Sequence, residues 1–158
     1  MNANKSLFFF QEGITYLNHG SFGACPKIIF EDYQKWQIQL ETQPVQFLTD
    51  KLYEALRNSR ESLAAFLGCK HDEILFFQNP TTAISNIIYN LNLNPEDEVL
   101  MTDHEYGALV RAWTAWGLRN KVKIRNAKIQ LPLESKSKFF DNVLKKISSK
   151  TKVLFLSL

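Results

Sequence analysis

Apolar residues in the first half of the chain recur with helical spacing. Pro26 suits the first turn of a helix whose end is predicted before Pro44. Its apolar face consists of Ile29, Tyr33, Trp36 and Leu40. A second helix should end at Gly68, a typical C-terminal stop. The apolar face of this second helix consists of Leu48, Leu52, Leu56, Leu63 and Leu67.

Short apolar runs of strand length follow and alternate with helical stretches. The predicted strands are residues 74–77, 99–101, 122–129 and 153–158, with a shorter one at 14–17. Three further helices are predicted: one with the apolar set from Ile84 to Leu91, one over residues 108–116, and one with the apolar set from Phe140 to Ile147. Gly117 should end the second of these. This alternation predicts an α/β fold with a mainly parallel sheet and helices on both faces.

The last predicted strand has no loop or helix after it. A buried parallel strand normally leads into a loop and a covering helix. We therefore expect the α/β domain to be incomplete at its C-terminus.

Composition narrows the class of protein. The 158 residues are 45% hydrophobic and 22% charged, as in a soluble globular domain, and no stretch approaches the length of a membrane span. A net charge of +3 is too small to indicate a nucleic-acid partner. Cys25 and Cys69 lie far apart, which suggests neither a disulfide framework nor a zinc site and favours a reducing cytoplasm.

The first candidate site is formed by Asn79, Pro80, Thr81 and Thr82, between a predicted strand and a predicted helix. Free amide groups at a helix N-terminus, with two hydroxyls beside them, are typical of a phosphate site. Ligands in open α/β sheets also bind at the carboxyl ends of strands. The alternative is that Thr81 or Thr82 only caps the helix.

Two further loops contain chemically useful side chains. Residues 102–107 offer an imidazole, an aromatic ring and two carboxylates, although acidic residues before a helix also cap it. Residues 18–23 contain two glycines and could equally be a plain turn. Other site types lack their motifs: no glycine-rich nucleotide loop occurs, the three histidines are not at metal-ligand spacing, and Ser21 is outside a hydrolase elbow.

Four segments together resemble a known family. Residues 16–26, 43–47, 79–82 and 97–107, in this order, look like the isopenicillin N epimerase-like branch of the pyridoxal-phosphate-dependent aminotransferase class V family. The resemblance implies a fold-type-I enzyme and a homodimer. Residues 1–47 would contribute to the small domain, and residues 48–158 would form the first part of the large cofactor-binding domain.

The resemblance also implies site residues. Thr81 and Thr82 would bind the phosphate of pyridoxal 5'-phosphate, and Tyr106, or His104 in another register, would stack on its ring. Asn18 and His19 would lie near an amino-acid-like substrate. The cofactor would act as an electron sink at the α-carbon. The lysine that holds it and the aspartate that pairs with its ring nitrogen are expected beyond residue 158, so the chain itself should supply no catalytic residue and be inactive alone.

The sequence leaves the reaction open among epimerase, desulfurase, lyase and transaminase chemistry on an amino acid or a small peptide-like amine. An alternative is a non-catalytic α/β module that binds a phosphorylated ligand or a second polypeptide. A third possibility is a structural remnant without a ligand.

Overall fold

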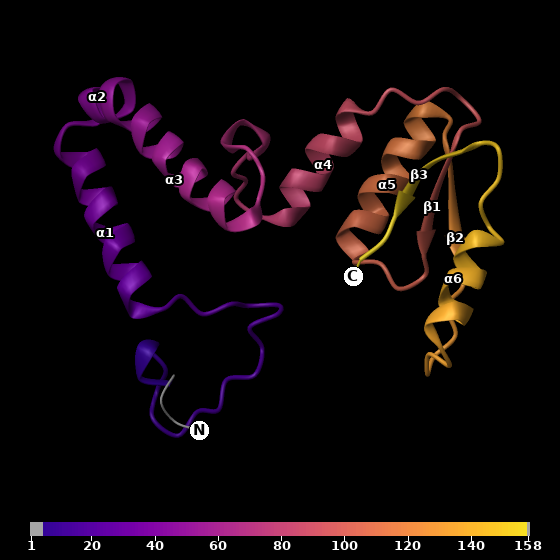
Figure 1. The fold of residues 1–158 in the computed structure, drawn as a ribbon, viewed down its shortest axis with the longest axis horizontal. Helices are drawn as coiled ribbons and strands as arrows, with labels where there is room; N and C mark the ends of the chain where they lie inside the picture. Colours follow the sequence, from indigo (N-terminus) through magenta and orange to yellow (C-terminus); the bar gives the residue numbers. More distant parts are fainter. Residues whose placement is uncertain (1–4, 158) are drawn as a thin grey trace. The chain divides into compact units, whose positions relative to one another are not determined.

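The computed structural model describes residues 5–157 (Figure 1). The chain divides into two compact units, residues 1–75 and residues 76–158. The assignment of residues 1–47 and 48–158 to a small and a large domain remains a prediction.

The first unit is helical. Gly68 has a left-handed backbone, with φ of 72°, and its amide donates to the Ala64 carbonyl, so the predicted stop of the second helix is confirmed. This helix begins earlier than predicted, because Pro44 starts a helical turn that continues through a π-helical turn. The elements are the 3₁₀ turn Lys5–Leu7, α1 (Lys27–Thr42), α2 (Pro44–Gln46), the π turn Phe47–Lys51, α3 (Leu52–Leu67) and the 3₁₀ turn His71–Glu73.

The apolar faces of α1 and α3 form little core within this unit. Ile29 and Tyr33 on α1 are 57% and 56% exposed, and Leu67 on α3 is 58% exposed. Phe47 is buried and contacts Trp36 edge to face, with ring centroids 6.1 Å apart. Helical periodicity therefore located these helices correctly, although it did not tell which of their apolar side chains are buried.

The second unit is built on a parallel three-stranded sheet with the strand order β2-β1-β3. The chain passes from β2 to β3 across the central strand β1, so both edges of β1 are paired. The elements are α4 (Pro80–Asn90), β1 (Glu98–Thr102), α5 (Gly107–Asn120), β2 (Lys123–Ala127), α6 (Lys136–Leu144) and β3 (Thr151–Phe155).

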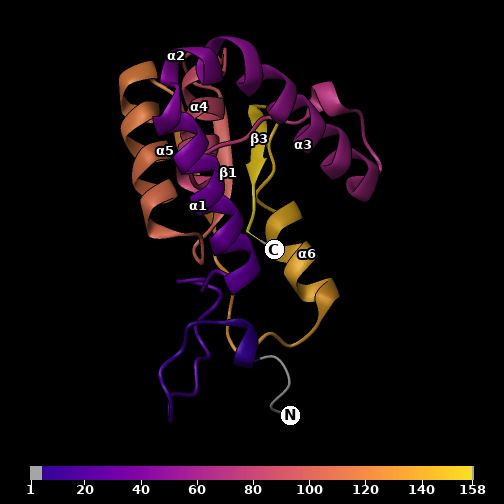
Figure 2. The ribbon, with the colours of Figure 1, turned by 90° about the vertical axis from the view of Figure 1, so that its left-hand side faces the viewer.

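Helices cover both faces of this sheet, as the sequence predicted. On one face, Val99 and Met101 of β1 pack with residues of α4 and α5, including Trp113. On the other face, Leu100 packs with Val143 of α6. Figure 2 shows α5 and α6 on opposite sides of the strands. All five residues of β1 are buried, which explains its unbroken apolar run.

Two predicted strands are wrong. Residues 14–17 and 74–77 are not part of any sheet in the structure. Ile74 has an extended backbone, but a strand requires a hydrogen-bonded neighbour, and none of residues 5–157 provides one. Leu75 is 74% exposed, so the apolar run at 74–77 is not a buried strand here.

Gly117 does not stop α5, contrary to prediction. The helix continues to Asn120 and ends at Lys121, whose φ is 57°. A Cβ at Gly117 would lie 2.9 Å from Ile124 Cγ1 and 2.9 Å from the Val122 carbonyl oxygen. This glycine therefore allows the close packing of α5 on β2, and it is not a terminator.

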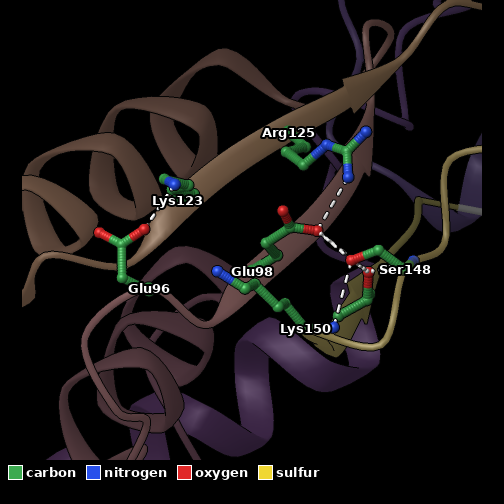
Figure 3. Close-up of polar contacts among 7 residues, drawn as sticks. Glu96, Glu98, Lys123, Arg125, Ser148 and Lys150 are labelled. Carbon is green, nitrogen blue, oxygen red and sulfur yellow. Dashed lines mark hydrogen bonds and ion pairs between the residues drawn. The ribbon is translucent and has the colours of Figure 1, made fainter.

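A polar cluster joins the amino-terminal ends of the three strands (Figure 3). Glu98 of β1 accepts hydrogen bonds from Arg125 Nη1 of β2 at 2.9 Å and from Ser148 Oγ, before β3, at 2.6 Å. These donors, the Ser148 hydroxyl first, hold the pKa of Glu98 below its ordinary value. Next to them, Lys123 and Glu96 form an ion pair at 2.5 Å, which lowers the pKa of Glu96 and raises that of Lys123.

Candidate functional site

The N-terminus of α4 is capped by a residue other than the threonines. Asn79 has an extended backbone, and its side-chain oxygen accepts from the Thr82 amide at 2.8 Å and from the Thr82 hydroxyl at 3.0 Å. Pro80, at the first helical position, has no amide hydrogen to satisfy. The alternative that Thr81 or Thr82 caps the helix is therefore wrong, because the cap is Asn79.

This arrangement leaves Thr81 available at the helix end. Within residues 5–157, neither the amide nor the hydroxyl of Thr81 has a hydrogen-bond partner. Thr81 and Thr82 are both partly exposed. A helix of 11 residues adds its positive dipole end at this position. An open amide, two hydroxyls and a helix dipole fit a phosphate group.

The loop after β1 is fixed to the chain that follows β2. Asp103 Oδ1 accepts from the Ile129 amide at 2.9 Å, and His104 Nε2 lies 3.0 Å from the Ile129 carbonyl oxygen. His104 can donate to that carbonyl in the tautomer with hydrogen on Nε2. The imidazole is thus engaged by the backbone beside it.

Glu105 fixes the same loop on its other side. One carboxylate oxygen accepts from the Thr102 hydroxyl at 2.5 Å, and the other accepts from the amide and hydroxyl of Ser157 at 2.9 Å and 2.6 Å. Thr102 ends β1, and Ser157 follows β3. Glu105 therefore joins the carboxyl ends of two neighbouring strands.

Tyr106 follows directly and is the N-cap residue of α5. Its carbonyl accepts from the amides of Leu109 and Val110, while its side chain is 62% exposed. The backbone of Tyr106 is thus fixed, and its ring is open to a ligand. The other candidate stacking residue, His104, has a side chain that is 46% exposed.

The second unit contains four of the predicted site residues, each next to the start of a helix. In Figure 1, α5 begins at the end where β1 finishes, and α4 packs on α5. Thr81 and Thr82 begin α4, while His104 and Tyr106 lie between β1 and α5. The carboxyl end of β1, which His104 and Tyr106 follow, is the end at which open parallel sheets bind ligands.

Asn18 and His19 belong to the first unit. The Asn18 carbonyl accepts from the Phe22 amide at 3.0 Å, and His19 Nδ1 accepts a long bond of 3.4 Å from the Ala24 amide. The His19 ring lies edge-on to Tyr16 at 4.8 Å, and Phe8 and Phe10 also contact it. The imidazole is held in an aromatic cluster, and its role near a substrate remains a prediction.

Sequence reasoning missed the contacts that hold this site. Asn79 was part of the first candidate site, and its role as the cap could have been found, because an asparagine directly before a proline at the first helical turn is a typical N-cap. Asp103 and Glu105 were noted only as acidic residues of the loop. Their partners, Ile129 and Ser157, are 26 and 52 positions away, so no local signal indicated these contacts.

A family model described as aminotransferase class V matches residues 24–158. The chain belongs to the aminotransferase class V family. This confirms the resemblance seen in the sequence.

The curated relatives of this class V chain include isopenicillin N epimerases. The enzyme of that name from Amycolatopsis lactamdurans is 26% identical over 147 residues, which cover 91% of this chain and 37% of the relative. A probable chloroplastic L-cysteine desulfhydrase from Arabidopsis thaliana is 26% identical over 133 residues, 79% of this chain and 28% of the relative.

Solved structures confirm the fold-type-I class. A mutant of C-DES with glycine covalently linked to its pyridoxal-phosphate cofactor superposes with a TM-score of 0.83 at 20% identity, over 96% of this chain and 40% of C-DES. A complex of the cystine C-S lyase C-DES with its product cysteine persulfide gives 0.81 at 21% identity, over 92% of this chain and 38% of C-DES. The class V chain thus spans 28% to 40% of the length of these three relatives.

Proposed function

We propose that this class V chain forms part of the pyridoxal-phosphate site of an enzyme that acts on the α-carbon of an amino acid or a small peptide-like amine. The observation that carries the proposal is that α4 begins with an open amide at Thr81, in the same unit as the exposed Tyr106 that precedes α5. When bound, the cofactor supplies an electron sink for a carbanion at the substrate's α-carbon.

Different residues of the chain would contact the phosphate and the ring of the cofactor. Thr81 would bind the phosphate through its amide and hydroxyl, and Thr82 would add a hydroxyl that now donates to Asn79. Tyr106 would cover one face of the ring, with His104 as the alternative. Asn18 and His19 would contact the substrate. The named activities of the relatives, desulfhydrase, epimerase and C-S lyase, are consistent with an amino-acid substrate.

The lysine that holds the cofactor covalently is proposed to lie outside this chain, since the chain matches less than half of each relative described above. The chain alone would then bind the cofactor only non-covalently and be inactive. Borohydride reduction with pyridoxal phosphate followed by mass analysis tests this: a mass gain on one lysine would contradict it.

Two further proposals concern the setting of the enzyme. A homodimer is proposed on family membership, and analytical ultracentrifugation of the full-length protein would test it.

A cytoplasmic location is supported by two exposed free thiols, Cys25 and Cys69, which fit a reducing compartment. Fluorescence localisation of the full-length protein would test the location. Among residues 5–157, no helix is sufficiently long and apolar to span a membrane.

The cofactor site is tested by equilibrium binding of pyridoxal phosphate to the purified chain and to Thr81→Val and Thr82→Val variants. Loss of one hydrogen bond to a charged phosphate should weaken binding about tenfold. Thr114→Val is the matched control, because the Thr114 hydroxyl only bonds to the Val110 carbonyl within α5. If the Thr81 and Thr82 variants both bind pyridoxal phosphate as tightly as the Thr114 variant, the site is contradicted. Binding of inorganic phosphate with no added affinity for pyridoxal phosphate would favour the non-catalytic phosphate-binding module.

A further inference from the structure

The Glu105 carboxylate bridges two strand ends that are far apart in sequence. Each of its oxygens serves a different strand: one accepts from Thr102 at the end of β1, and the other accepts from Ser157 beyond β3. The four donors are two hydroxyls and two amides, all neutral. No cation pairs with Glu105 among residues 5–157.

The geometry of these bonds restricts the loop between β1 and α5. On the β2 side, Asp103 and His104 hold both backbone groups of Ile129. On the β3 side, Glu105 holds Ser157. The loop therefore has a fixed attachment on each side, and the residue that follows both attachments is Tyr106.

We propose that Glu105 is a positioning residue, which fixes the Tyr106 ring in the orientation that binds the pyridine ring of the cofactor. This inference rests on the proposed function. Tyr106 directly follows Glu105 and is the N-cap residue of α5, so a change in the direction of the loop at Glu105 changes the direction of the Tyr106 side chain. A ring fixed in advance loses less conformational entropy on binding than a mobile one.

A positioning role and a purely structural role differ in which part of the ligand they affect. Inorganic phosphate probes only the end of α4, whereas pyridoxal phosphate also probes the ring contact. If Glu105 acts through Tyr106, its replacement should change the affinity for pyridoxal phosphate and leave the affinity for inorganic phosphate unchanged. A general loosening of the unit should weaken both affinities.

The test measures the Kd of the purified 158-residue chain for both ligands. For Glu105→Gln we expect pyridoxal-phosphate binding to weaken about five- to tenfold, the size expected for one misaligned aromatic contact, with unchanged phosphate binding. In a Tyr106→Ala background the same substitution should have no further effect, because the ring it positions is absent. Glu134→Gln, which removes an exposed carboxylate from a pair with Lys138, is the control.

Ser157→Ala provides a second variant if Glu105→Gln does not fold. It removes the hydroxyl that donates to Glu105 at 2.6 Å and should weaken pyridoxal-phosphate binding in the same selective way. The inference is overturned if both variants bind pyridoxal phosphate normally, if they lose both ligands equally, or if the Glu105 and Tyr106 effects add independently. If the unmodified chain binds neither ligand, the proposed function itself fails. If only the threonine variants lose affinity, the phosphate site stands without the positioning role.

Discussion

Arg125 on β2 donates a hydrogen bond of 2.9 Å to Glu98 on the adjacent strand β1. The Glu98 side chain is only 10% exposed, and Ser148, which precedes β3, donates to the same carboxylate oxygen. One carboxylate therefore joins all three strands at the end of the sheet opposite to Glu105.

Replacing Glu98 with Gln should make the free energy of unfolding less dependent on pH in the acid range. The pKa of Glu98 in the folded protein is lowered from an ordinary 4.5. The stabilisation by its ionised carboxylate is therefore complete above pH 4.5 and is lost as the pH falls through the folded pKa. The variant should be less stable than the parent at neutral pH, and the difference should shrink below about pH 4. Urea unfolding followed by circular dichroism across this range provides the measurement.

Glu134→Gln is the control for that experiment, because the Glu134 side chain is 52% exposed. Its unfolding midpoints should keep the pH slope of the parent protein. An equal slope in the Glu98 and Glu134 variants would show that the Glu98 contacts do not stabilise the ionised carboxylate.

Gly117→Ala should destabilise the second unit, although alanine favours helices. The added Cβ would meet Ile124 and the Val122 carbonyl at 2.9 Å, and such overpacking costs about 1–3 kcal/mol. Thr114→Ala, at an exposed position of the same helix, should instead stabilise by about 0.5 kcal/mol through helix propensity. Urea midpoints that rise for both variants would disprove the close contact.

Lys121→Gly should stabilise the protein by about 1 kcal/mol, because glycine adopts a left-handed backbone without the steric cost that a side chain carries. Lys121 has φ of 57° and ends α5. Arg119→Gly, inside the same helix, should have the opposite effect and cost about 1 kcal/mol. Thermal melts of both variants provide the measurement. A lower Tm for the Lys121 variant would contradict the left-handed backbone conformation at Lys121.

Asn79→Ala should cost about 1 kcal/mol of stability, since it removes the cap that accepts from Thr82. Asn79→Asp should retain most of that stability, because aspartate also accepts from the amide. Urea unfolding of the three proteins tests this. A full loss in the aspartate variant would mean that the amide group of Asn79 has another role.

The candidate site was predictable where its signals are local. Thr81, Thr82 and Tyr106 stand next to helix starts that apolar spacing and proline placement indicate. The contacts of Asp103 and Glu105 were not predictable, because each depends on a strand end 26 or 52 residues away in the sequence.

The sequence by itself determined the helices, the parallel α/β class and the family, because periodicity, buried apolar runs and short motifs are local properties. Only the tertiary structure decided that residues 74–77 pair with no strand among residues 5–157, that Gly117 serves close packing inside a helix, and that Glu98 and Glu105 join strands at opposite ends of the sheet. These depend on which segments become neighbours, and pairing between distant segments leaves no pattern in the chain itself.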